Sequence, residues 1–154
     1  MQQPTKSDIA RQIENEHEEL KKQMDLLKSV VQSELDQNNF KDWQVNVVLT
    51  LREFKGTLEK HFEMEEIGGF NEELVRLKPQ NKKKIEELET EHREIILKIE
   101  NIIAHLKELI HYEKEKINAV VNDVLNLIET LYLHEAAERE LVNNTYFLDV
   151  GSAD

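Results

Sequence analysis

Cysteine is absent from this sequence of 154 residues. Its absence excludes disulfide bonds, thiolate metal ligands, iron–sulfur ligation and cysteine nucleophiles. Any bound metal must therefore use histidine, carboxylate or water as its ligands. Glycine and proline are also scarce, with four and two residues, so the chain has few of the residues that usually interrupt helices.

Positive charge is scarce as well. The sequence has 20 lysine and arginine residues against 32 aspartate and glutamate residues, which gives a net charge of −12. Binding to nucleic acid or to anionic lipid needs a basic surface, so we expect neither partner. No stretch approaches the roughly 18 uninterrupted apolar residues of a membrane span, and "MQQPTKSDIARQ" at the start has no apolar run preceded by basic residues. We therefore expect a cytoplasmic protein with no membrane partner.

Apolar residues recur at steps of three and four, the spacing typical of amphipathic helices. The four stripes are Ile9, Ile13, His17, Leu20, Met24, Leu27 and Val31; Val47, Leu51, Phe54, Leu58, His61 and Glu65; Ile85, Leu88, His92, Ile95, Ile99, Ile102, Leu106 and Leu109; and Ile117, Val120, Val124, Leu127, Leu131, His134, Glu138 and Leu141. They predict an all-α fold, an up-down-up-down antiparallel four-helix bundle, as one domain over residues 1–154. The predicted helices cover roughly 8–33, 43–66, 79–111 and 115–147, with Asp42 capping the second and Pro79 beginning the third.

Six polar residues occupy apolar positions of these stripes. Two motifs supply four of them: "HFEME" at 61–65 and "HEAAE" at 134–138 each place a glutamate four residues after a histidine. Residues four apart lie on the same face of a helix. The six candidate site residues are His17, His61, Glu65, His92, His134 and Glu138.

The four histidines are expected at one level of the bundle. Two residues of an antiparallel hairpin face each other when the turn lies midway between them, because both helices rise about 1.5 Å per residue. The midpoint of His17 and His61 is Asn39, and that of His92 and His134 is Glu113. Both midpoints fall in predicted turns, so the six side chains should converge on one place.

Two buried glutamates level with four buried histidines would be costly unless cations neutralise the cluster. Six side chains are too many for one tetrahedral zinc ion, and imidazole with carboxylate suits iron, manganese or zinc rather than calcium or magnesium. Glutamates on facing helices can each bridge two ions, and two histidines can complete the protein ligands of each. The pattern therefore predicts a dinuclear metal site. "HEAAE" lacks the second histidine of the zinc-protease motif, which excludes that interpretation.

The order His17, His61 and Glu65 in "HFEME", His92 in "EHRE", then His134 and Glu138 in "HEAAE" resembles the hemerythrin-like, or HHE cation-binding, domain over essentially the whole chain. The resemblance implies a four-helix bundle with a non-haem di-iron centre of two Fe ions, bridged by the two glutamates and by oxygen when oxidised. Members of the family carry or sense dioxygen, respond to iron, act on peroxide or nitric oxide, or help repair iron centres.

The chain departs from the oxygen-carrying members, which have a second histidine on the third helix and an aspartate after the last histidine. Leu88 and Ile96 flank His92 at four residues on either side, so a fifth histidine is missing and about two coordination positions stay open. Iron-centre repair proteins generally carry a cysteine-containing segment, which this chain lacks.

These features favour a di-iron protein that binds dioxygen or a similar small ligand at a four-histidine, two-glutamate site, for sensing or storage. The alternatives are an enzyme that consumes peroxide or nitric oxide, an iron-buffering protein, and a metal-free interaction bundle. Glu66 and Glu135 are candidates for contacts to the ligating histidines or for auxiliary ligands. His105 and His111 lie off the stripes and are expected on the surface.

Overall fold

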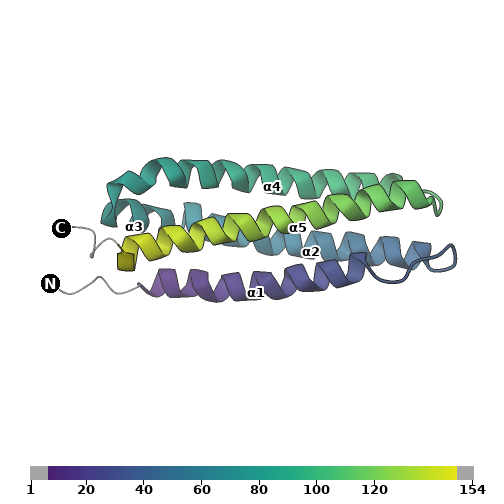
Figure 1. Ribbon diagram of the computed structural model, residues 1–154, viewed down its shortest axis with the longest axis horizontal. Coiled ribbons are helices and arrows are strands. Elements are labelled where there is room, and N and C mark those ends of the chain that lie inside the picture. Colours follow the sequence, from purple (N-terminus) through teal and green to yellow (C-terminus); the bar gives the residue numbers. More distant parts are fainter. Residues whose placement is uncertain (1–6, 149–154) are drawn as a thin grey trace.

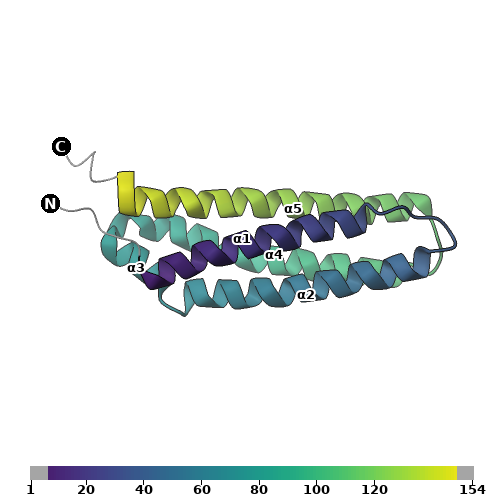
Figure 2. The same cartoon turned by 90° about the horizontal axis from the view of Figure 1, so that it is seen from below.

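The computed structural model describes residues 7–148, which form helices and no strand. Four long helices run antiparallel to their neighbours along one axis (Figures 1 and 2). This arrangement confirms the predicted all-α, up-down-up-down bundle. The elements are α1 (Asp8–Val31), α2 (Phe40–Glu66), the short α3 (Phe70–Leu77), the 3₁₀ turn η1 (Pro79–Asn81), α4 (Lys82–Glu108), α5 (Lys114–Asn143) and the π-helical turn η2 (Asn144–Leu148).

The apolar stripes decide which face of each helix is buried. In α1 the buried residues step by three or four from Ala10 through His17 to Val31, so one face turns to the core along the whole helix. Ser7 is the N-cap of this helix, and its Oγ accepts a hydrogen bond from the backbone N–H of Ala10 at 3.1 Å. None of the helices among residues 7–148 is long and apolar enough to cross a membrane.

The start of α2 differs from the prediction. The helix begins at Phe40, and its N-cap is Asn39 rather than Asp42, which lies in the first turn. Asn39 makes no capping bond, because its Oδ1 accepts from the backbone N–H of Asp36 in the preceding loop. Phe40 and Trp43 are both buried, and their burial accounts for the earlier start.

No helix was predicted between residues 66 and 79, but the structure has α3 in this connection. Gly69, with φ of 101°, turns the chain into this eight-residue helix, and Phe70 and Leu74 bury its apolar face. A helix this short is not stable alone, so packing rather than propensity forms it. Pro79 begins η1, and α4 begins three residues later at Lys82.

The turn between α4 and α5 is tied to α2. Helix α4 ends at Glu108 and α5 begins at Lys114, close to the predicted 111 and 115. Nε2 of Gln44 donates hydrogen bonds to the carbonyl oxygens of Leu106 and Leu109, at 2.6 and 2.8 Å. These bonds tie the end of α4 to α2, and the Leu106 carbonyl also accepts a hydrogen bond from the backbone N–H of Leu109 at 3.2 Å.

The interior contains two apolar clusters, one on each side of the level that the histidines occupy. The larger cluster fills the bundle from Leu20, Leu58, Ile95 and Leu131 towards the loops at 32–39 and 109–113. The smaller cluster closes the other end, and its members are Ala10, Ile13, Phe70, Leu74, Ile85, Leu88, Leu141, Val142 and Tyr146. The polar level between them holds the candidate site.

Candidate metal centre

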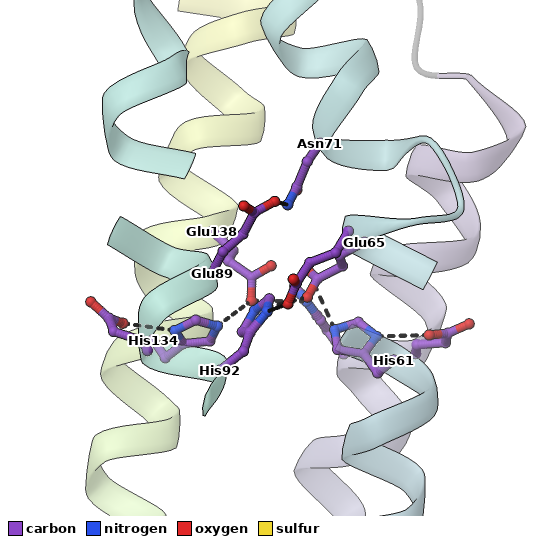
Figure 3. A network of polar contacts seen from close by, with 11 residues as sticks. His61, Glu65, Asn71, Glu89, His92, His134 and Glu138 are labelled. Atoms are coloured by element: carbon purple, nitrogen blue, oxygen red, sulfur yellow. Dashed lines mark hydrogen bonds and ion pairs between the residues drawn. The ribbon is translucent and has the colours of Figure 1, made fainter. Parts of the chain in front are cut away.

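The six predicted residues come together in the interior. His17 is on α1, His61 and Glu65 are on α2, His92 is on α4, and His134 and Glu138 are on α5, each with at most 6% of its surface exposed. In Figure 3 the side chains of His61, Glu65, His92, His134 and Glu138 point towards one another across the bundle. The level argument from helix rise therefore placed all four histidines correctly.

Their side-chain atoms form two groups that share a carboxylate. One ligand atom from each of His17, His61, Glu65 and Glu138 lies within 4.8 Å of the others, and His92, His134 and Glu138 make a second such group. Each group has the size and the residue types of a metal site.

The two glutamates lie between the histidine pairs. In Glu65, Oε2 is 3.5 Å from Nε2 of His61 and Oε1 is 3.2 Å from Nε2 of His92. Oε1 of Glu138 is 2.9 Å from Nε2 of His134 and 4.0 Å from Nε2 of His17. Both carboxylates therefore face both pairs, as bridging ligands of two ions would.

The atoms at the centre have no hydrogen-bond partners. Nε2 of all four histidines, both carboxylate oxygens of Glu65 and Oε1 of Glu138 are buried and unpartnered. A buried polar atom without a partner costs free energy, and native interiors contain few of them. Bound cations would give every one of these atoms a partner, so the donor set fits metal ions.

Three of the histidines are oriented by carboxylates from the neighbouring helix. Nδ1 of His61 lies 2.7 Å from Glu16, Nδ1 of His92 lies 2.7 Å from Glu66, and Nδ1 of His134 lies 2.7 Å from Glu91. In each pair Nδ1–H donates to the carboxylate, which leaves the Nε2 lone pair directed at the centre. Metal-binding histidines are commonly fixed in this way.

The sequence anticipated one of these three carboxylates. Glu66 had been a candidate for a contact with a ligating histidine or for an auxiliary ligand, and it contacts His92, whereas Glu16 and Glu91 were missed. Each missed residue directly precedes a candidate histidine, in the two "EH" pairs at 16–17 and 91–92. That adjacency was the available signal.

Glu135 behaves differently from Glu66. It is 4% exposed, its Oε2 has no hydrogen-bond partner, and it belongs to neither group of potential ligand atoms. His105 and His111 are exposed on the surface, as predicted.

Burial keeps the histidines neutral at physiological pH. Loss of hydration, reinforced by neighbouring cationic groups, lowers the pKa of His17 to about 3, of His61 to about 4 and of His92 to about 2. Burial also lowers the pKa of His134, although Glu91 opposes the shift. Neutral imidazole is the form that binds metal.

The buried carboxyl of Glu138 has the opposite shift. Burial raises its pKa to about 8, so the metal-free chain keeps it protonated at neutral pH. A cation beside it would favour the ionised form instead. Metal binding at this position is therefore linked to the release of a proton.

The fold and the cluster together define a metal-binding four-helix bundle with histidine and carboxylate donors on all four long helices. The family model of the hemerythrin HHE cation-binding domain matches residues 8–145. The chain belongs to this family, as the order of its histidines and glutamates had indicated. Comparisons with curated proteins and with solved structures gave no match.

Proposed function

We propose that the protein is a non-haem di-iron protein that binds dioxygen or a similar small ligand. The observation that carries the proposal is the set of unpartnered buried atoms, in which two carboxylates lie between two pairs of neutral histidines. Imidazole nitrogen with carboxylate oxygen suits iron, and six side chains exceed the needs of a single tetrahedral ion.

In this proposal His17 and His61 would hold one iron and His92 and His134 the other. Glu65 and Glu138, which face both histidine pairs, would supply carboxylate oxygens to both ions. Four histidines and two glutamates would not fill all the positions of two six-coordinate ions, so an exogenous ligand could bind as well. When bound, the iron pair supplies the redox chemistry and the open positions for a diatomic or peroxidic ligand.

The protein's own groups have separate tasks. Glu16, Glu66 and Glu91 keep three imidazoles in the tautomer that presents Nε2. The two apolar clusters exclude water along the bundle axis, which lowers the local dielectric around the charges. The cytoplasmic location expected from the sequence is part of the same proposal.

Anaerobic reconstitution with ferrous iron tests the function. We expect about two irons per chain, and stable, reversible spectral changes when dioxygen or nitric oxide is added. Sustained consumption of peroxide or nitric oxide would instead assign the protein as an enzyme. Iron that loads and leaves without any ligand response would favour buffering, and a single zinc ion after iron-replete expression would contradict the di-iron assignment.

A further inference from the structure

The histidine–carboxylate pairs close three of the four sides of the candidate site. Glu16 of α1 meets His61 of α2, Glu66 of α2 meets His92 of α4, and Glu91 of α4 meets His134 of α5. Each pair joins two neighbouring helices. The remaining side lies between α5 and α1, where His17 is the histidine to be covered.

His17 has no such partner. No carboxylate among residues 7–148 lies within 4.0 Å of its Nδ1, and its one close carboxylate, Glu138, faces Nε2. His17 is also the most exposed of the four histidines, at 6% against 2 or 3%. The side between α5 and α1 is therefore open at the level of the site.

The sequence shows why this side is open. The two halves of the chain repeat the same order, with Glu65 followed by Glu66 in α2 and Glu138 followed by Arg139 in α5. Glu66 accepts a hydrogen bond from Nδ1–H of His92. Residue 139 is the counterpart of Glu66 in the second half of the chain, so it occupies the matching position for His17. Arginine cannot accept a hydrogen bond, and its charge acts on His17 as a repulsive cation.

A groove of about 370 Å³ marks the open side, lined by residues that include His17, Met24, Tyr132, Glu135 and Arg139. Glu135 is 4% exposed, yet its Oε2 has no partner. Grooves also border His61 and His92, but Glu16 and Glu66 line those grooves and bond to the histidines there. The groove between α1 and α5 alone among these three reaches a histidine that no carboxylate covers.

We propose that small exogenous ligands reach the metal pair through the groove between α1 and α5, which His17 and Arg139 line. The apolar clusters close both ends of the bundle, so the approach must be lateral. The unpartnered Oε2 of Glu135 supplies a polar contact beside the incoming ligand. This inference rests on the proposed di-iron function, because it needs two bound ions.

Azide is the probe, added to the oxidised, iron-loaded protein. Arg139→Glu should close the groove by supplying the missing carboxylate for His17, and Arg139→Trp should close it by bulk without adding negative charge. Both should keep about two irons per chain and slow azide association by about tenfold or more, the scale of electrostatic and steric control of entry to a cleft.

Arg52→Glu is the matched control, because it makes the same charge change on an exposed position of α2 nine residues before His61. It should bind azide at the wild-type rate. A wild-type rate in either Arg139 variant that carries two irons overturns the groove as the route. Failure of the wild type to bind two irons would instead reject the di-iron function, so the two failures can be told apart.

Discussion

Oε1 of Glu91 on α4 lies 2.7 Å from Nδ1 of His134 on α5. This contact joins two helices and fixes the tautomer of a candidate ligand. Glu91→Ala should therefore weaken metal binding by about 10- to 100-fold, the usual effect of losing such a contact. A competition titration with a metal chelator measures the loss.

Glu94→Ala is the control for this change, since Glu94 is exposed on the same helix. Its metal affinity should equal that of the wild type. Equal affinities in all three proteins would show that the Glu91 contact does not support the site.

The two central glutamates should act as one unit. If Glu65 and Glu138 each contact both ions, Glu65→Ala or Glu138→Ala alone should reduce occupancy of the whole pair rather than empty one position. Each loss leaves positive charge less compensated in a buried site, at a cost of several kcal/mol. The double variant should be little worse than either single variant.

Iron content and the optical spectrum of the three variants test this expectation. His105→Ala serves as the control, because His105 is exposed on α4 and far from the site. If either glutamate variant binds two irons with an unchanged spectrum, the assignment of Glu65 and Glu138 as bridging ligands is wrong.

The stability of the metal-free protein should be greatest near pH 6.5. The four histidines have pKa values below their ordinary 6.5, so below that pH the unfolded chain binds protons that the folded chain does not. Stability must then fall as the pH decreases. Burial raises the pKa of Glu135 to about 7 and of Glu138 to about 8, and it also raises the pKa of the more exposed Glu16 and Glu66. These carboxyls oppose the fall in stability below pH 6.5, but the four histidines outnumber the two glutamates with large shifts.

Above pH 6.5 the contribution of the histidines fades, and the buried carboxyls of Glu135 and Glu138 dominate the pH dependence. The folded chain must release protons from buried carboxyls, whereas the unfolded chain has already released them, so stability falls as the pH rises towards 8. Thermal melting of the metal-free protein between pH 5 and 8.5 should show this maximum. Glu138→Gln should flatten the alkaline side, and a midpoint that rises steadily across the range would refute the assignment.

Removing the metal at neutral pH should lower the melting temperature. A ligand present at about 1,000 times its dissociation constant stabilises a folded protein by about 4 kcal/mol, which corresponds to roughly 10 °C for a chain of this size. The difference should shrink in mild acid, because protonated histidine does not bind metal. Coincident melting curves of loaded and metal-free protein at pH 7 would count against a site that joins four helices.

The short helix α3 should contribute to stability through Phe70. This side chain is 1% exposed within the smaller apolar cluster, so Phe70→Ala should cost about 3–5 kcal/mol. Glu72→Ala, at an exposed position of the same helix, should change stability by about 0.5 kcal/mol or less. Urea unfolding measures both, and a small effect at Phe70 would mean that α3 is dispensable.

The sequence predicted the bundle and the convergence of the six side chains because both follow from regular geometry. Helical spacing identifies the buried face, and the constant rise per residue places His17, His61, His92 and His134 at one level. The role of these residues as ligands stays a prediction. Helix α3 could not be predicted, since its eight residues depend on contacts with distant residues of α1, α4 and α5.

The periodicity of the sequence could not predict the carboxylate–histidine contacts either. Glu16 and Glu91 occupy partly exposed positions beside the buried stripe, where most glutamates face solvent. Whether such a residue reaches across to a neighbouring helix depends on the helix rotation and the rotamer, which spacing does not specify. For the same reason the sequence did not show that Arg139 leaves His17 without a carboxylate partner. That conclusion needs the observed bond between His92 and Glu66, the counterpart of Arg139.

The polar level between the two apolar clusters divides what could have been one continuous hydrophobic interior. Leucine or phenylalanine at the four histidine positions would join the clusters and produce a bundle more stable than the metal-free protein, since well-packed apolar residues commonly outperform buried polar ones. The metal-free wild-type chain should thus be less stable than such a variant, because it keeps the polar residues of its site, and functional sites often lower stability in this way. Where metal is scarce, the lower stability of the metal-free chain would make the protein's lifetime depend on its metal supply.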